Sequence, residues 1–587
     1  MNYPVWDLQS SGLIIAIISV VHVFVSHFAV GGGLFLVLTE HKARREHDTL
    51  LLDYVKRHSR FFTLLTLVFG AITGVGIWFS ISLVHPAATS SLITTFVWGW
   101  AIEWTFFIAE IAAAMVYYYG WDRLSPRQHL AVGWIYFANA YLSLVIINGI
   151  LSYMLTPGQW LVTRGFWDGF FNPTYWSSLV ARSIGAFGLA GLYALLTASF
   201  LKDPRLKAKV ASYAVTRWVL PMAVVLPLSF FWYFAAAHAA GVPLEEIFNA
   251  KAGNLFDILT ATFSQAAAQA GQPFSQRALR VAVIAMVASL AVTLYVLLRR
   301  ERFGRPSAVL VMVCGLLSIG GAEWVREGLR KPYVIGGFMF VNGVRVPGPL
   351  DESLKPPAEL GEDPFSIDVL DRTGVLAANK FVRLPDGYVP GQPINAATPE
   401  EGIEIEAKLG AEIFRLECAS CHSLDRYNAI RPLVAGKSSA SIYNMIERLA
   451  EPPLRPASAA DWPGAGLLVK SWRGRRMPPF VGTDAEAHAL AVYLTRLGGG
   501  QISPPEPVEE VGGAKTGAGL FDESCSMCHD AEGEMRIQLM LKGRSADELF
   551  DALDKLPKLN AAMPPFEGTD EERRVLADYL AGLEKAQ

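Results

Sequence analysis

Long apolar runs fill the first 330 or so residues of the chain, whereas the remainder mixes short apolar stretches with charged and proline-rich segments. A helix needs about 20 mostly apolar residues to cross a bilayer. Eight runs approach or exceed that length, at roughly 11–39, 61–84, 93–120, 130–155, 177–201, 218–240, 279–298 and 307–325. The pattern predicts an all-α fold that begins, over residues 1–345, with a polytopic transmembrane helix bundle.

The loops between these runs differ sharply in positive charge. Those after the first, third, fifth and seventh runs hold 6, 2, 5 and 4 Lys or Arg residues, and those after the second, fourth and sixth hold 0, 1 and 2. The positive-inside rule places the richer loops in the cytoplasm, so both ends of the bundle lie outside. We expect a multi-pass protein of the inner (cytoplasmic) membrane whose C-terminal part lies on the periplasmic side. No basic patch predicts a nucleic-acid partner.

The C-terminal part carries the pattern Cys-x-x-Cys-His twice. Two cysteines at that spacing can form thioethers to one porphyrin, and the adjacent histidine then ligates the iron. Zinc is the competing interpretation of two Cys-x-x-Cys pairs. The immediate histidine and a methionine further on favour two covalent haem c groups. The expected attachment residues are Cys418, Cys421, Cys525 and Cys528, and the expected axial histidines are His422 and His529.

An internal repeat surrounds both motifs. Met-Pro-Pro-Phe, then Gly-Thr-Asp, then a helix ending in Tyr-Leu follow each motif, which predicts two copies of one small helical domain. Met477 and Met563 are the candidate second axial ligands, since a thioether suits electron transfer; packing in the core is the alternative. The segments resemble class I cytochrome c domains, at 401–500 and 511–587. Residues 346–400, rich in Pro, Asp, Glu and Gly, predict an extended linker.

Several ionisable residues interrupt the apolar runs, where such groups are costly and indicate function by default. The first run holds His22 and His27, and the third holds Glu103 and Glu110, seven residues apart and therefore on one helix face. The eighth ends with Glu323, Trp324, Glu327 and Arg330. Hydrogen-bonded packing is the alternative for each residue alone. Together they predict a haem iron in the outer half of the membrane and a proton route to it.

In order along the chain, these residues resemble subunit I of the cytochrome bd-type oxidases. The resemblance lies in segments 21–25, 70–74, 101–110, 120–124, 148–149 and 323–333. It implies a pair of high-spin haems of type b or d, with His22 as an axial ligand and Glu327, beside Trp324, serving the other haem. It also implies that Glu103 and Glu110 line the oxygen site and its proton path, and that Arg330 pairs with propionates.

Departures from the family pattern affect the low-spin haem b. Where the family has a histidine and a methionine ligand, this chain has Arg182 and Arg280, which could bind propionates or replace the charge of a lost haem. The quinol-oxidising loop lacks a clear Lys-x4-Glu pair, and the ninth helix is missing. His85 and His238, near outer helix ends, are candidates for a relocated low-spin haem; solvated histidines are the alternative.

These patterns predict an oxidoreductase that passes electrons from a periplasmic donor, such as a c-type cytochrome, through two c haems to a membrane haem that reduces oxygen. The alternatives are a non-catalytic electron conduit, with six-coordinate haem held by His22 and His27 or by His85 and His238, and nitric oxide reduction at the same site. A second membrane subunit and the lipid bilayer are the other expected partners.

Overall fold

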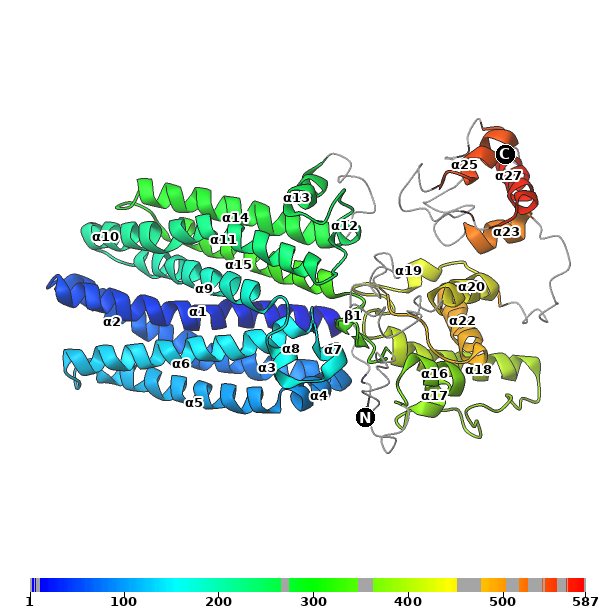
Figure 1. The fold of residues 1–587 in the computed structure, drawn as a ribbon, viewed down its shortest axis with the longest axis horizontal. Helices are drawn as coiled ribbons and strands as arrows, with labels where there is room; N and C mark the ends of the chain where they lie inside the picture. The colour runs from blue at the N-terminus through cyan, green and yellow to red at the C-terminus, as the bar shows by residue number, and fades with distance from the viewer. Residues whose placement is uncertain are drawn as a thin grey trace. The chain divides into compact units, whose positions relative to one another are not determined.

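The computed structural model describes residues 3, 4, 6, 11–264, 274–346, 363–450, 477–502, 517–525, 541, 544–556, 566 and 568–584. The chain divides into two compact units, one consisting mainly of Met1–Leu370 and the other of most of the chain from Asp371 onwards. Each unit is described by itself (Figure 1).

The first unit is a bundle of long helices that run side by side (Figure 1). Eight of its helices, among the residues described, are long and apolar enough to cross a membrane, which confirms the predicted number. The spans are Gly12–Arg45, Thr49–Val84, Val97–Gly120, Pro126–Tyr153, Tyr175–Ala198, Pro204–Ala239, Ser275–Leu298 and Arg305–Arg330.

The helices that make up these spans are α1 (Ser11–Arg45), α2 (Thr49–Thr63), η1 (Leu64–Gly70), α3 (Ala71–Val84), α5 (Val97–Gly120), α6 (Pro126–Tyr153), α9 (Tyr175–Ala198), α10 (Pro204–Ala214), η2 (Val215–Val219), α11 (Leu220–Ala239), α14 (Phe274–Leu298) and α15 (Arg305–Arg330). Short helices connect them: α4 (Pro86–Thr95), α7 (Trp160–Thr163), α8 (Phe166–Phe170), α12 (Leu244–Ile247) and α13 (Leu255–Phe263).

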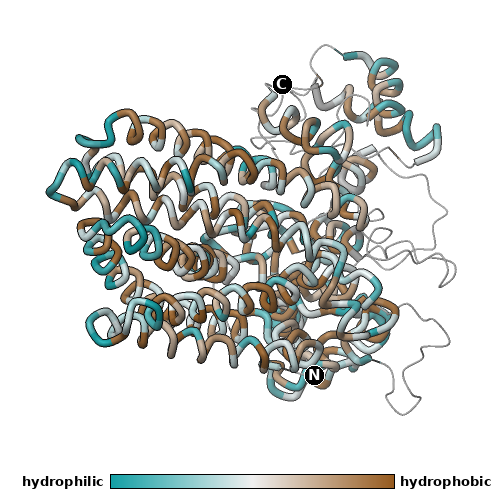
Figure 2. Tube along the Cα trace, turned by 60° about the vertical axis from the view of Figure 1, so that its left-hand side comes forward, coloured by the Kyte–Doolittle hydropathy of each residue, from teal (hydrophilic) through white to brown (hydrophobic). Residues whose placement is uncertain are grey.

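The bundle end that holds the Lys/Arg-rich turns extends beyond the predicted spans. There α2 continues through η1 into α3, and α10 continues through η2 into α11. Side chains at the helix starts explain the added turns, because Asp48 and Asp203 accept hydrogen bonds from the first free N–H groups of α2 and α10. Lys56 of α2 forms an ion pair at 2.7 Å with Asp122, which lies in the turn after α5. In Figure 2 the hydrophilic colour gathers at these turns and the hydrophobic colour runs along the helices.

Small residues let the central helices approach closely. A Cβ added at Gly31 of α1 would lie 2.0 Å from the carbonyl oxygen of Ala186 in α9. The same two helices also meet where the ring of Phe28 in α1 stacks on the ring of Tyr193 in α9, with centroids 3.9 Å apart. Close backbone approach at glycine is how helices gain van der Waals contact where lipid provides no hydrophobic drive.

A short hairpin follows α15, which the sequence did not predict. Strands β1 (Tyr333–Ile335) and β2 (Met339–Phe340) pair antiparallel, and every residue in them is buried. The N–H of Gly336 donates to the carbonyl of Met154 at 2.9 Å, and the Phe338 ring packs edge-on against Trp160 at 5.1 Å. The hairpin therefore belongs to the bundle, at the end of α6.

The expected extended linker is folded in part where it is described, whereas residues 379–398 contain no helix or strand and none of them is buried. Arg345 pairs with Asp363 at 2.5 Å, and its carbonyl accepts from the N–H of Ile367 at 3.1 Å. Helices α16 (Ile367–Thr373) and α17 (Val375–Ala378) follow. The Glu486 carboxylate accepts from the N–H groups that begin α17, at 2.9 and 2.8 Å. Four buried apolar residues explain the folding of this segment: Ile367, Leu370, Val375 and Leu376.

The second unit is also helical. Its helices are α18 (Pro399–Ile413), η6 (Phe414–Cys418), α19 (Arg431–Val434), α20 (Ser439–Ala450), α22 (Asp484–Gly498), α23 (Gly517–Ser524), α25 (Ala546–Leu553) and α27 (Asp570–Glu584).

One helix crossing occurs twice in this unit. At Gly410 of α18 an added Cβ would lie 2.0 Å from the carbonyl oxygen of Ala489 in α22, and at Gly517 of α23 it would lie 2.4 Å from Cβ of Tyr579 in α27. A phenylalanine four residues after each glycine packs against a tyrosine, with ring centroids 5.8 and 5.9 Å apart: Phe414 with Tyr493 and Phe521 with Tyr579.

Candidate functional site

His22 of α1 is held in the tautomer that can ligate iron. Its Nδ1 lies 3.0 Å from the Thr73 hydroxyl of α3. That hydroxyl donates its own proton to the carbonyls of Phe69 and Gly70, at 2.9 and 3.1 Å, so it accepts from the Nδ1–H of His22. The lone pair then resides on Nε2, the nitrogen available to a metal. Gly74 gives the ring room, since a Cβ there would lie 3.1 Å from Cε1.

His27 faces a different part of the bundle. Its Nδ1 bonds to the carbonyl of Val23 at 2.9 Å, and it lies within electrostatic reach of Arg182 and Glu323. Five residues on one helix separate it from His22, or roughly 140° around the axis. Two side chains on one helix cannot approach opposite faces of the same porphyrin. The arrangement therefore argues against His22 and His27 as the two axial ligands of one haem.

Arg182 of α9 is engaged within the protein. Its guanidinium lies 3.6 Å from the carboxylate of Glu323 on α15, and its Nε donates to the Ser178 hydroxyl at 3.4 Å. Glu323 also accepts from Arg326 at 2.8 Å. The charge of Arg182 thus has a carboxylate partner inside the bundle.

The two predicted carboxylates of α5 each meet a hydroxyl of α6. Ser143 donates to Glu103 at 2.9 Å, and Tyr136 donates to Glu110 at 2.9 Å. Both residues are partly exposed on the bundle surface. Glu103 and Glu110 lie on one face of α5, as their spacing predicted, and both bond to α6. His22, in contrast, bonds to α3.

Charged residues gather where α15 ends. Glu327 forms an ion pair with Arg330 and a second with Lys331, at 3.0 Å for the latter. His85, between α3 and α4, lies near the same cations: burial, with Lys331 and Arg330 nearby, lowers the pKa of His85 to about 4, against the effect of Glu327. Trp324 is 37% exposed on the bundle surface. The described geometry thus brings Glu327, Arg330 and His85 together.

Arg280 and His238 have partners elsewhere. Arg280 of α14 donates from Nε to the Thr262 carbonyl in α13 at 3.2 Å. His238, in the last turn of α11, lies 3.4 Å from Glu245 and is about half exposed. Their assignment to a relocated haem or to propionates stays a prediction.

His422 of the first Cys-x-x-Cys-His motif is also set for ligation. Its Nδ1 donates to the Asn428 carbonyl at 3.1 Å, which leaves Nε2 for a metal. Burial lowers the pKa of His422, and this favours the neutral, ligating imidazole. The Cys421 N–H donates to the Cys418 carbonyl at 3.1 Å, so the two thiols lie on one tight turn.

The other predicted axial residues differ in what the structure describes. Met477 is 41% exposed and stays a predicted ligand. Cys525 lies at the end of α23. Cys528, His529 and Met563 lie outside the described residues.

Several residues that orient these groups escaped prediction: Thr73, Ser143, Tyr136 and Ser178. Hydroxyl side chains are common in apolar helices and carry no signal alone. Spacing could have found two of them, since Tyr136 and Ser143 are seven residues apart, like Glu103 and Glu110.

Comparison with known families matches both ends of the chain. Residues 11–246 match the family described as "Cytochrome bd terminal oxidase subunit I", and residues 512–580 match "Cytochrome C oxidase, cbb3-type, subunit III". The predicted first cytochrome c domain, 401–500, lies outside both matched ranges. No curated protein gave a significant match.

Among solved structures, bd oxidase from Geobacillus thermodenitrificans matches with 16% identity and a TM-score of 0.38, over 56% of this chain and 89% of that one. The two family matches give the chain a bd oxidase subunit I-like membrane domain and a cytochrome c-like domain. They indicate a haem-binding oxidoreductase of membrane electron transport.

Proposed function

We propose that this chain is the catalytic subunit of a membrane-bound, cytochrome c-linked oxidase related to the bd type. One observation carries the proposal. A single chain holds His22, fixed by Thr73 with Nε2 available, in a domain that matches bd subunit I, and His422, fixed in the same manner, beside Cys418 and Cys421. Iron with an open axial position supplies oxygen binding and reduction.

Electrons enter, in this proposal, from a periplasmic donor such as a c-type cytochrome and pass through two covalent haem c groups. The repeated helix crossing at Gly410 and Gly517 supports two domains of the same kind. The pairing of Arg182 with Glu323 supports loss of the low-spin haem b, because the sequence resemblance assigns to Arg182 the place of the family's histidine ligand and this arginine is ion-paired within the protein. Electrons that no longer arrive from quinol through that haem need another entry.

The membrane site is proposed to hold one or two haems of type b or d. His22 is the axial ligand of the first, and Glu327 with Trp324 serves the second. Arg330 would pair with propionates, and its ion pair with Glu327 puts it beside the residue proposed for the second haem. Glu103 and Glu110 deliver protons, and the hydroxyls of Ser143 and Tyr136 hold them in position.

A second membrane subunit is proposed to cover α3 and α5. Both helices expose large apolar residues along their length, and Glu103 and Glu110 lie partly exposed among them. A carboxylate facing lipid is costly, whereas one facing a protein partner can be hydrogen-bonded. The exposed apolar residues include Ile72, Val75, Phe79, Trp98, Trp104 and Ile108.

The haem assignments are tested by spectroscopy on the purified full-length protein. Pyridine haemochrome analysis should give two haem c per chain together with haem b or d. Carbon monoxide added to the dithionite-reduced protein should give a high-spin difference spectrum. Its absence would leave only an electron conduit. Turnover with oxygen and with nitric oxide, measured with an ascorbate-reduced c-type cytochrome as donor, decides the acceptor.

A further inference from the structure

Polar residues join α5 to α6 at three levels, two helical turns apart. The three levels share one spacing, seven residues on each helix, or about 10 Å of rise per step. Because the helices are antiparallel, the spacing keeps every pair aligned. The pairs, here named the polar seam, are Glu103 with Ser143, Glu110 with Tyr136, and Tyr117 with His129. Proton delivery as proposed above uses the first two pairs.

The third pair adjoins the buried carboxylate of Glu40 from α1. Glu40 and His129 are both 0% exposed. His129 Nδ1 lies 2.9 Å from both carboxylate oxygens of Glu40, and the Tyr117 hydroxyl donates to Glu40 at 2.7 Å. Arg44, which is partly exposed in the last turn of α1, also donates to Glu40 at 2.7 Å. This network lies at the Lys/Arg-rich end of the bundle.

The geometry fixes the number of protons shared by Glu40 and His129. His129 Nε2 lies 2.9 Å from the Tyr117 carbonyl, which can only accept, so Nε2 carries a proton. Nδ1 faces two carboxylate oxygens, and that contact is favourable only with one proton between them. The pair is therefore either imidazolium with carboxylate or imidazole with carboxylic acid. Both forms hold a single transferable proton.

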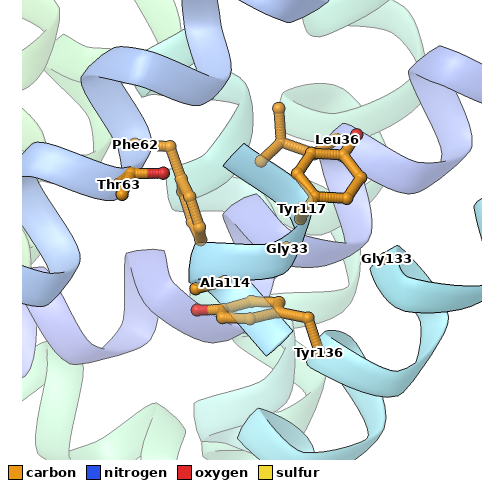
Figure 3. A pocket seen from close by; sticks show the side chains of 8 residues that line it. All are labelled: Gly33, Leu36, Phe62, Thr63, Ala114, Tyr117, Gly133 and Tyr136. Atoms are coloured by element: carbon orange, nitrogen blue, oxygen red, sulfur yellow. The ribbon is translucent and has the colours of Figure 1, made fainter. Parts of the chain in front are cut away.

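A small cavity lies beside Tyr117 of this network and beside Tyr136, which donates to Glu110. It has room for about one water molecule (about 10 Å³), and the rings of Tyr117 and Tyr136 both line it (Figure 3). Glycines bring the two rings close to α1 and α6: a Cβ at Gly33 would lie 2.4 Å from the Tyr136 ring, and one at Gly133 would lie 3.0 Å from the Tyr117 ring. Water in a cavity between two phenol groups can relay a proton.

We propose that Glu40 and His129 form the cytoplasmic proton-loading site of the oxidase, and that Tyr117 and the cavity pass the proton to Tyr136 and Glu110. The inference rests on the proposed function and extends it to the side from which protons enter. In each cycle the Nδ1–H bond of His129 breaks as its proton moves to Glu40. The Glu40 carboxylic acid then gives a proton to the Tyr117 oxygen as the Tyr117 O–H proton passes to water in the cavity, and Glu40 returns to its carboxylate. A proton from solvent at Arg44 replaces the lost one on the Glu40–His129 pair, and no electron moves.

The test compares wild type with Glu40→Gln and Glu40→Asp in the full-length membrane complex. Two quantities are measured on the same samples: proton uptake when the haems are reduced without oxygen, and the rate of oxygen consumption. We expect Glu40→Gln to slow both by roughly ten- to hundredfold, because a positioned acid–base group is lost. Glu40→Asp should restore most of the rate. Haem content and the carbon monoxide spectrum should be unchanged.

If Glu40→Gln loses its haem, Tyr117→Phe and Tyr54→Phe provide a second, matched comparison. Both phenols are buried, but Tyr54 bonds to Ala194 and Thr197, away from the polar seam. Only Tyr117→Phe should slow proton uptake. Wild-type uptake in Glu40→Gln or in Tyr117→Phe, or no uptake by wild type on reduction, overturns the loading site. Normal uptake by wild type without oxygen consumption overturns the oxidase and leaves the loading site supported.

Discussion

Two histidines of the bundle, the partly buried His22 and the buried His58, share one hydrogen-bonding pattern and differ in their surroundings. Nδ1 of His58, like that of His22, bonds to a threonine hydroxyl, Thr197, at 2.9 Å. That hydroxyl donates in turn to carbonyls of its own helix. The rings of Phe35 and Tyr54 pack around His58, with centroids 5.3 and 5.6 Å away. His58 is thus enclosed by aromatic rings, whereas His22 adjoins Gly74.

Substitution of His22 should therefore remove the carbon monoxide-binding haem, and substitution of His58 should not. We expect His22→Ala to abolish the carbon monoxide difference spectrum and His58→Gln to leave it intact. Thr73→Val, which keeps the shape but loses the acceptor, should weaken haem retention by roughly ten- to hundredfold. Haem titration of the purified variants measures this effect. An unchanged spectrum in His22→Ala would remove His22 from the site.

His488 should make the second unit sensitive to pH. Its Nδ1 lies 3.6 Å from Glu406 of α18, and the interaction with this carboxylate raises the pKa of His488 above 6.5. A raised pKa stabilises the folded state below the unfolded value of 6.5, and that stabilisation is lost as pH rises through the folded value. His488→Gln should flatten this decline, by less than about 1 kcal/mol. Thermal unfolding between pH 6 and 9, followed by haem c absorbance, measures it.

At the residue scale, the sequence predicted charged groups better than the hydroxyls that orient them. Glu103 and Glu110 stood out because a carboxylate in an apolar run is costly. Ser143 and Tyr136 did not, since serine and tyrosine are ordinary residues of such helices. The partner of Arg182 could not be predicted, because it depends on which residue of α15 faces α9. The hydropathy of the sequence does not show how two helices are oriented toward each other.

At the scale of elements, glycine determines how the paired helices of the second unit cross. Gly410 and Gly402 both lie in α18 and provide a matched comparison. At Gly410 a Cβ would overlap the Ala489 carbonyl oxygen, whereas at Gly402 it would meet only Cβ of Ala396 at 3.7 Å. The helix propensity of the two sites is similar. Any difference in stability between the same substitution at Gly410 and at Gly402 therefore measures the cost of disturbing the helix crossing.

Gly410→Ala should destabilise the second unit by several kcal/mol, because a close backbone contact cannot relax. Gly402→Ala should stabilise it by about 1 kcal/mol, the gain of alanine over glycine in a helix. Thermal unfolding followed by haem c absorbance compares the two. Equal effects would show that the helices can separate without cost.

Elements were predicted wherever one pattern dominates the sequence, as long apolar runs do in the bundle. The length of the apolar runs alone predicted the spans. The helical turns that this prediction missed lie in polar segments such as α2 and α10, whose starts depend on Asp48 and Asp203. The hairpin at Tyr333 and the folded segment at Ile367 were missed for another reason. Their apolar residues are buried by contacts with distant parts of the chain, and glycine and proline nearby suggested a loop.

At the scale of the whole molecule, the Lys/Arg-rich turns predict on which side each end of the chain lies. Four such turns lie at one end of the bundle, between α1 and α2, α5 and α6, α9 and α10, and α14 and α15. An alkaline phosphatase reporter, active only in the periplasm, should be active when fused after residue 584 and inactive when fused at Arg300. The reverse result would invert the topology and place the C-terminal part of the chain in the cytoplasm.

The seven-residue spacing of the polar seam makes α6 sensitive to its own length. One residue inserted between His129 and Tyr136 would rotate the rest of α6 by roughly 100° relative to α5 and separate the first two pairs of the seam. An insertion in the turn at 121–125 would leave the spacing within each helix unchanged. On the proton path proposed above, descendants of this chain must therefore keep the length of α6 between these residues, whereas that turn can vary.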